Sequence, residues 1–464
     1  MKNMTLERIA RACGGTYKGK EADLAREVAG VVLDSRKVEA DYCFIATRGE
    51  RVDGHSFIAD VLKKGAACIV CEYIPEGIEG NFIVVKDSFQ ALKEIAEDYR
   101  STLSIPIIGI TGSVGKTSTK EFLAGVLAQK YNVLKTEGNF NNEIGVPLTL
   151  LRIRPEHEIA VLEMGINHFG EMRRLSKMVK PDTCVMTNIG ECHLEFLESR
   201  EGVLRAKSEI FEYLQKDGTV YVNGDDDMLQ TIELVKHKKP VAFGLGKRND
   251  YYASAVENKG LRGCEVVIHT PNEEFPASIY VPGAHMIRNA LAATAIGQQY
   301  GLNTEEIAAG IASVTPVGGR SNIIDCGNLT LIDDCYNANP VSMRAALDLL
   351  GLAEGKQLAI LGDMGELGEK QEEYHAQIGA YAIEKKITGL ICVGRLSRFM
   401  YQSACRAKEK QLSNTFVQYY ETLEELFAAL EQADENLLSE EITILVKASH
   451  SMQFSQIVER WKTC

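Results

Sequence analysis

The sequence predicts a three-domain α/β protein. Its 464 residues exceed the usual size of one domain and suggest roughly three compact units. Short apolar runs alternate with amphipathic stretches, which is typical of strands and helices in α/β folds. We expect an N-terminal α/β domain at residues 1–102, a central P-loop ATPase-type domain with a mixed sheet at 103–315, and a Rossmann-like C-terminal domain at 316–464.

The N-terminal segment contains short predicted strands with glycine turns between them. Its CxxC sequence, Cys68 to Cys71, lies in an apolar stretch that predicts a buried strand, where positions i and i+3 face opposite sides. We therefore interpret these cysteines as core residues and not as metal or redox ligands. Hydrophobic periodicity alone gives this segment no function. The other predicted strands of the segment are Val31–Leu33, Cys43–Ala46 and Phe82–Val85.

The central and C-terminal segments continue the same alternation. A Pro/Gly cluster at 315–319 marks the boundary between them. The last segment has no GxGxxG loop, so no dinucleotide is assigned to it. The central strands are predicted at Ile105–Ile110, Ile159–Leu162, Cys184–Met186, Thr219–Val222 and Val241–Phe243. The C-terminal strands are predicted at Leu331–Ile332, Leu358–Leu361, Leu390–Val393 and Ile442–Val446.

Composition excludes several classes of protein. A net charge of -13 argues against a nucleic-acid partner, because binding to phosphate backbones needs a broad basic surface. Uncharged apolar runs of the roughly 18 residues needed for a membrane span are missing. The charged N-terminus does not resemble a signal peptide, so a cytoplasmic protein with reduced cysteines is expected.

The strongest motif is a candidate phosphate loop between an apolar strand and a helix. Its sequence is Thr111-Gly112-Ser113-Val114-Gly115-Lys116-Thr117. Glycines allow backbone amides to converge on phosphate oxygens, Lys116 supplies positive charge, and the Thr117 hydroxyl can bind Mg²⁺. The alternative is a glycine-rich turn that binds nothing. The strand context and the GKT sequence favour an ATP site.

The spacing TGxxGKT resembles that of the Mur ligase and folylpolyglutamate synthase superfamily. Two later runs, Asp333 through Pro340 and Leu361 through Gly368, resemble the branch of the Mur ligase family that adds D-alanyl-D-alanine. The resemblance extends over essentially the whole chain. The central runs that carry it are Gly138–Pro147, Glu163–Gly165, Thr187–Ile189, His193–Glu195, Ala206–Ile210 and Asn223–Asp226.

The resemblance implies an ATP-dependent ligase. Such an enzyme would join UDP-N-acetylmuramoyl-tripeptide to D-alanyl-D-alanine through an acyl phosphate, with ATP and Mg²⁺, in peptidoglycan synthesis. The alternatives are a Mur ligase that adds a different amino acid and a nucleotide-binding switch without catalysis. The resemblance also implies that the N-terminal domain binds the UDP-substrate and that the C-terminal domain binds D-alanyl-D-alanine and closes over ATP. A monomer is expected, although the sequence does not settle the oligomeric state.

Individual roles also follow from the resemblance. The catalytic group would be Lys116, Glu163, His193 and Lys207, and Lys207 would be carbamylated by CO₂ to act as a metal ligand. In isolation, Glu163 would be a solvated strand-end carboxylate, His193 a structural histidine and Lys207 a solvated helix lysine. The metal ligands would be Thr117, Glu163, His193 and Lys207, and the nucleotide would bind Gly112, Ser113, Val114, Gly115, Lys116, Thr117, Asn289, Arg320 and Asp334. Substrate contacts are expected from Ser35, Asn139, Asn142, Asn337 and Asn339.

The chain departs from the family pattern at several positions. Met286 stands where the family usually has Asn, Ser321-Asn322 replaces a Met-Glu pair, and Ala448 and His450 replace Gly and Arg. These departures put single contacts in doubt but not the resemblance as a whole.

Overall fold

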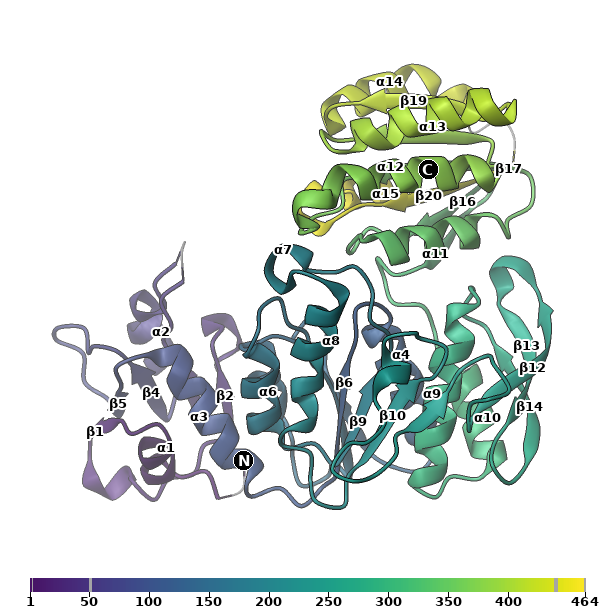
Figure 1. Ribbon diagram of the computed structural model, residues 1–464. Coiled ribbons are helices and arrows are strands. Elements are labelled where there is room, and N and C mark those ends of the chain that lie inside the picture. The colour runs from purple at the N-terminus through teal and green to yellow at the C-terminus, as the bar shows by residue number, and fades with distance from the viewer. Residues whose placement is uncertain (2, 50–51, 438–440, 463–464) are drawn as a thin grey trace.

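The structure is a computed structural model that describes residues 1, 3–49, 52–437 and 441–462. Figure 1 shows the N-terminal part beside the central part, with the C-terminal part standing over the central part. None of the helices in these described ranges combines the length and apolar character that crossing a lipid bilayer requires.

The N-terminal part is a five-stranded sheet that is parallel except for one edge strand. Cys68 packs into the same core as Ile9, whereas Cys71 packs into a second core with Phe44 on the other side of the sheet. The prediction that these cysteines are buried on opposite faces is confirmed. In order across the sheet, the strands are β1 (Thr16–Lys18), β5 (Phe82–Val84), β4 (Cys68–Cys71), β3 (Tyr42–Ile45) and β2 (Gly30–Val32), and the helices are α1 (Leu6–Ala12), α2 (Ile58–Lys63) and α3 (Ser88–Arg100).

The central part is built on a six-stranded sheet that is parallel throughout. Its order is β11 (Val241–Phe243), β10 (Thr219–Asn223), β9 (Thr183–Met186), β6 (Ile107–Thr111), β8 (Ile159–Glu163) and β7 (Val133–Lys135). Its helices are α4 (Lys116–Leu127), α5 (Gly145–Leu150), α6 (Glu171–Val179), α7 (Leu194–Leu197), α8 (Arg200–Ser208), α9 (His285–Gln299) and α10 (Thr304–Ala312).

The antiparallel strands of this region form a separate three-stranded sheet, which the sequence analysis did not predict. Its strands are β12 (Tyr252–Asn258), β13 (Cys264–His269) and β14 (Glu274–Ile279). Figure 1 shows this sheet beside α10, at the edge of the central part away from the N-terminal part.

The N-terminal and central parts share one hydrophobic core. Helix α3 packs against α5 and α6, and its residues join the apolar cluster under the central sheet. Hydrogen bonds cross the same interface. The Tyr99 hydroxyl donates to the Ile153 carbonyl at 2.6 Å, and Arg100 donates to the Val179 carbonyl at 2.7 Å. Together these contacts fix the orientation of the two parts.

The C-terminal part is a six-stranded sheet in which only β15 is antiparallel. Its two faces carry separate apolar clusters, as expected for a Rossmann-like sheet covered on both sides. The order is β15 (Asn322–Cys326), β16 (Leu329–Asp333), β20 (Ile442–Lys447), β17 (Lys356–Gly362), β18 (Gly389–Val393) and β19 (Phe416–Tyr420). The helices are α11 (Pro340–Leu350), α12 (Gln371–Glu384), α13 (Ser397–Gln411), α14 (Leu423–Leu437) and α15 (Ser455–Lys462).

Candidate nucleotide-binding site

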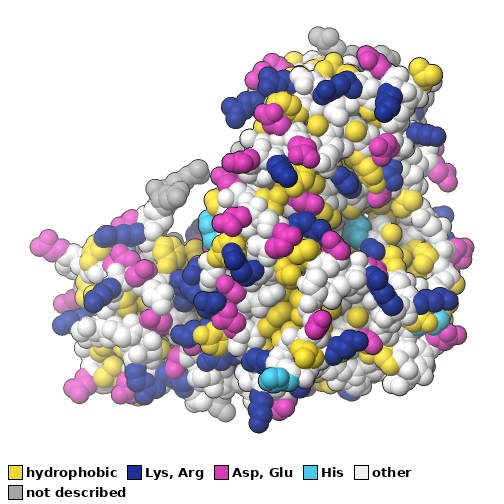
Figure 2. Space-filling view, viewed as in Figure 1, with side chains coloured by type: hydrophobic (Ala, Val, Ile, Leu, Met, Phe, Trp, Pro, Cys, Tyr) yellow, Lys and Arg dark blue, Asp and Glu magenta, His cyan; other side chains and the backbone are white. Residues whose placement is uncertain are grey.

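A cavity of about 1190 Å³ lies between the central and C-terminal parts. It opens at the carboxyl ends of the central parallel strands, where ligands of α/β sheets bind. On the face shown in Figure 2, basic and acidic side chains are interspersed, without a broad basic surface.

The candidate phosphate loop joins β6 to α4. Gly115 precedes the helix at φ 84°, and no side chain caps the first helical amides. Gly112 has φ 149°, and a Cβ there would lie 1.9 Å from the Thr187 hydroxyl oxygen. Neither position tolerates a side chain without a change in backbone conformation. The loop and the open helix N-terminus have the backbone geometry expected of an anion site.

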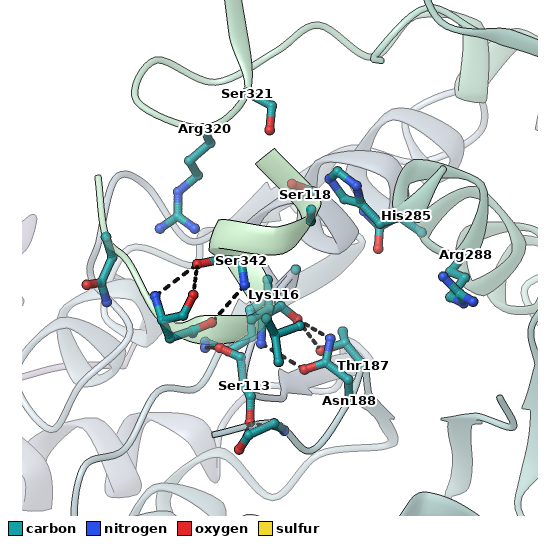
Figure 3. A pocket seen from close by; sticks show the side chains of 18 of the residues that line it. Ser113, Lys116, Ser118, Thr187, Asn188, His285, Arg288, Arg320, Ser321 and Ser342 are labelled. Carbon is teal, nitrogen blue, oxygen red and sulfur yellow. Dashed lines mark hydrogen bonds between the residues drawn. The ribbon is translucent and has the colours of Figure 1, made fainter. Parts of the chain in front are cut away.

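The loop is fastened to the end of β9. The amide of Val114 donates to the Asn188 side-chain oxygen at 2.9 Å, and the Thr187 hydroxyl donates to the Val114 carbonyl at 2.6 Å (Figure 3). These contacts hold the loop in shape.

Lys116 folds back over its own loop. Its ammonium donates to the carbonyls of Gly112 at 2.7 Å and Ser113 at 3.4 Å. Burial lowers the pKa of Lys116 to about 8, and the nearby charge of Lys207 adds to this effect. A bound polyphosphate would supply the negative charge that this buried ammonium lacks.

Glu163 ends β8 and is 1% exposed, so it is not a solvated strand-end carboxylate. It accepts hydrogen bonds from the Thr117 hydroxyl at 2.7 Å and from the Asn141 amide at 2.7 Å. The structure thus brings two predicted metal ligands, 46 positions apart in sequence, into direct contact.

Lys207 lies on α8 and is 1% exposed. Its ammonium has no hydrogen-bond or ion-pair partner within the described part of the chain. Burial lowers its pKa, and its charge acts on both Lys116 and His193. The alternative reading of a solvated helix lysine is wrong, because an unpaired ammonium at this depth is costly.

His193 stands at the N-terminus of α7 with φ 53°. Its Nδ1 pairs with the carboxylate of Glu366, which belongs to the C-terminal part. Burial lowers the pKa of His193, although the bond to Glu366 acts in the opposite direction. The histidine thus contacts both domains that line the cavity.

The predicted contacts of the C-terminal part lie at the upper wall of the cavity. Figure 3 shows Arg320 pointing from this side towards the phosphate loop, and its guanidinium stacks over the Tyr336 ring at 4.0 Å. Asp334 forms an ion pair with Lys447 at 2.7 Å and accepts from the Ser321 amide at 2.9 Å. Both predicted residues line the cavity.

Asn289 lies on α9 and is 6% exposed. Its side-chain oxygen accepts from the Thr119 hydroxyl at 3.0 Å, and its amide donates to the sulfur of Met286 at 3.4 Å. Both ends of the amide therefore have protein partners. Met286, one of the departures from the family pattern, thus contacts Asn289 through its sulfur.

The predicted substrate residues fall into separate places. Ser35 lies in the N-terminal part, where its carbonyl accepts from Lys64, and it does not line the cavity. Asn139 and Asn142 line the cavity beside the phosphate loop. Asn337 and Asn339 line its opposite wall, and Asn339 also caps α11 in a capping box with Ser342.

Sequence reasoning did not assign roles to several residues of the site. Asn141 and Asn188 lie inside the runs that carry the family resemblance, so their position in these runs was the available signal. Glu366 likewise lies in the run Leu361 through Gly368, but only tertiary contacts show that it meets His193, 173 positions away, and that Lys447 meets Asp334, 113 positions away.

The residues present suit Mg²⁺, which prefers oxygen ligands. Thr117 and Glu163 offer adjacent oxygens, and His193 offers a nitrogen. No group of three or more His, Cys, Asp or Glu side chains arranged for a metal ion occurs among the described residues. A metal bound here would need further oxygen ligands from outside these three side chains.

The fold and site define an α/β protein with a candidate phosphate loop under a second domain. Comparisons with known proteins identify it more narrowly. Residues 27–105 match the Mur ligase family catalytic domain, 110–297 the Mur ligase middle domain, and 319–450 the Mur ligase glutamate ligase domain. The chain is 37% identical to the UDP-N-acetylmuramoyl-tripeptide--D-alanyl-D-alanine ligase of Bacillus subtilis, over 99% of this chain and 98% of that one.

Similarity to solved structures indicates the same family. A crystal structure of MurF from Acinetobacter baumannii has a TM-score of 0.88 and 30% identity, with 99% of each chain covered. MurF from Thermotoga maritima, solved in complex with ADP, has a TM-score of 0.80 and 26% identity, with 94% of this chain and 97% of that one covered. The chain belongs to the Mur ligase family.

Proposed function

We propose that this protein is an ATP-dependent ligase that joins UDP-N-acetylmuramoyl-tripeptide to D-alanyl-D-alanine in the cytoplasm. The products would be ADP, phosphate and the UDP-muramoyl-pentapeptide used in peptidoglycan synthesis. The observation that carries this proposal is the full-length likeness to the Bacillus subtilis ligase, together with a phosphate loop whose Thr117 touches Glu163.

The chain's own groups suit a reaction between anions. Lys116 and the amides at the start of α4 would bind the β- and γ-phosphates, so that the tripeptide carboxylate can attack the γ-phosphorus and form an acyl phosphate. Arg320 would add positive charge from the opposite wall. Bound Mg²⁺, held by Thr117, Glu163 and His193, would supply further charge compensation.

The second step is attack by an amine. The amino group of D-alanyl-D-alanine adds to the acyl carbon, phosphate leaves, and the amine proton is lost to solvent or to phosphate. Asn337 and Asn339, on the C-terminal wall of the cavity, are our candidates for contacts with this dipeptide. Ser35 is our candidate for the UDP-sugar, which therefore enters from the N-terminal side.

The domain assignment is part of the proposal. Residues 1–102 would bind the UDP-substrate, 103–315 would bind ATP, and 316–464 would bind the dipeptide and close over the nucleotide. We also propose that the protein acts as a monomer.

A test of the reaction measures phosphate release from ATP with each acceptor in turn, and mass spectrometry of the product. We expect turnover with D-alanyl-D-alanine and UDP-N-acetylmuramoyl-tripeptide, with lysine and diaminopimelate tripeptides compared side by side. Turnover only with a different amino acid would indicate another ligase of the family. No turnover with any acceptor, despite nucleotide binding, would indicate a switch.

We further propose that Lys207 is carbamylated. The modification requires a neutral amine, and burial without a partner lowers the pKa of Lys207 in this direction. A carbamate would replace the unpaired cation by two oxygens, which suit Mg²⁺.

Lys207→Ala should therefore be nearly inactive while nucleotide binding persists, and formate or acetate should restore part of the activity by entering the vacated space. Lys216→Ala, on the exposed surface, is the control. Full turnover of Lys207→Ala, or an unmodified Lys207 in crystals of active enzyme, would refute this role.

A further inference from the structure

The loop after β17 brings a carboxylate of the C-terminal domain to His193 of the central domain. Glu366 pairs with Nδ1 of this histidine. The backbones of the two segments also meet, because the amide of Glu195 donates to the Glu366 carbonyl at 3.4 Å. A Cβ on Gly368 would lie 3.4 Å from the Glu195 backbone, so the approach is close. The sequence run Leu361 through Gly368 contains this loop, and the proposed reaction gives it no role.

The loop that carries Glu366 is firmly held in its own domain. The amide of Met364 donates to Nε2 of the buried His375 at 2.9 Å, and the amide of Gly365 donates to the Ser449 hydroxyl at 2.8 Å. Glu366 follows directly after these anchors, and its side chain projects out of the domain with 42% exposure. The carboxylate is thus presented in a fixed position.

Both partners have an unusual backbone conformation. Glu366 has φ 59° and His193 has φ 53°, in the left-handed region that residues other than glycine seldom adopt. Such conformations cost energy and persist where the surroundings over-determine them, often at functional sites. Here two of them face each other across one domain contact.

The chemistry of the contact concerns the second ring nitrogen. A histidine that binds a metal commonly donates its other N–H to a carboxylate, which fixes the tautomer and makes the ligating nitrogen more basic. A proton on Nδ1, donated to Glu366, leaves the lone pair of Nε2 free. Mg²⁺ binds nitrogen less readily than oxygen. A carboxylate partner that makes Nε2 of His193 more basic would therefore strengthen its bond to the metal.

We propose that Glu366 is a positioning residue that orients His193 towards the metal, so that docking of the C-terminal domain completes the metal site. This inference rests on the proposed function, because it takes His193 as a metal ligand. It assigns to the C-terminal domain a part in assembling the metal site, in addition to its contacts with nucleotide and dipeptide.

The test is Mn²⁺ binding to the enzyme–ADP complex, measured by electron paramagnetic resonance. Glu366→Ala should weaken Mn²⁺ binding about 10- to 100-fold. Glu366→Gln should weaken it less, because the amide oxygen still accepts the N–H but carries no charge. The control Glu369→Ala, at an exposed position on the same loop, should bind as the wild type does. In a His193→Ala background, Glu366→Ala should have little further effect.

Several outcomes would overturn the inference. Unchanged Mn²⁺ affinity in Glu366→Ala would mean that the contact only joins the domains, and tighter binding would mean that Glu366 competes with the metal for the histidine. Thermal unfolding and small-angle scattering identify a variant that is misfolded or whose C-terminal domain is undocked. If Glu366→Ala is such a variant, the Mn²⁺ affinity of Glu366→Gln tests the inference instead. Because Mn²⁺ binding needs no turnover, the result separates this inference from the proposed reaction. An enzyme without ligase activity can still show the predicted loss of affinity, and an active ligase can fail to show it.

Discussion

The ion pair between Asp334 and Lys447 should contribute several kcal/mol to the stability of the C-terminal domain. The Lys447 side chain is 2% exposed, and its ammonium lies 2.7 Å from the Asp334 carboxylate. It also donates to the carbonyls of Asn337 at 2.8 Å and Asp334 at 3.3 Å. Asp334→Asn would leave a buried cation with carbonyl partners only. Removal of one partner of a buried pair costs about 3–5 kcal/mol, and the remaining hydrogen bonds place this case near 3.

The reverse change should cost less. After Lys447→Met, Asp334 keeps 13% exposure and the hydrogen bond from the Ser321 amide, so about 1–2 kcal/mol is expected. The double variant should therefore be more stable than the sum of the single effects predicts, by about 1–2 kcal/mol.

The assay is urea unfolding without nucleotide, followed by the fluorescence of Trp461. This is the only tryptophan of the chain, and it is buried in α15 of the same domain. A loss below about 1 kcal/mol for Asp334→Asn, or strictly additive effects in the double variant, would refute the reasoning.

Three further predictions concern the cavity. Lys116→Ala should lower kcat by orders of magnitude while calorimetry shows unchanged binding of UDP-tripeptide, and near-wild-type turnover would contradict its role. Gly112→Ala should weaken nucleotide binding about tenfold or more, measured with a fluorescent ATP analogue, because its Cβ would lie 1.9 Å from the Thr187 hydroxyl. Asn339→Ala should destabilise the C-terminal domain by about 1 kcal/mol through loss of the α11 cap. Asn339→Asp should restore this stability, and an unaffected Asn339→Ala would show that the cap contributes little.

The sequence predicted those features that are encoded locally. The phosphate loop occupies consecutive positions between a strand and a helix, and the apolar runs such as Ile159–Leu162 form the buried strands of the sheets. The sheet β12–β14 was missed, although β13 contains the apolar run Val266–Ile268. Its partner β12 gives a weaker signal, because the second half of Tyr252–Asn258 is exposed and the pairing with β13 is irregular.

Contacts between residues distant in the sequence could not be predicted from local patterns. No pattern in the sequence connects Glu366 with His193, or Asn141 with Glu163, because each pair meets only when separate elements pack together. The burial of Lys207 shows the same limit. A lysine near the end of a helix is usually solvated, and only the packing of α8 against the rest of the central part buries Lys207.

The core shared by the N-terminal and central parts has a consequence for how the chain comes apart. Since α3 packs against α5 and α6, cutting the chain near residue 102 would uncover apolar surface on both fragments. The C-terminal part keeps its own clusters on both sheet faces. We therefore expect the three domains to unfold as two cooperative units. Protease cleavage near residue 316 should release a C-terminal fragment that stays folded. The first two domains should be expressed and should unfold as one piece.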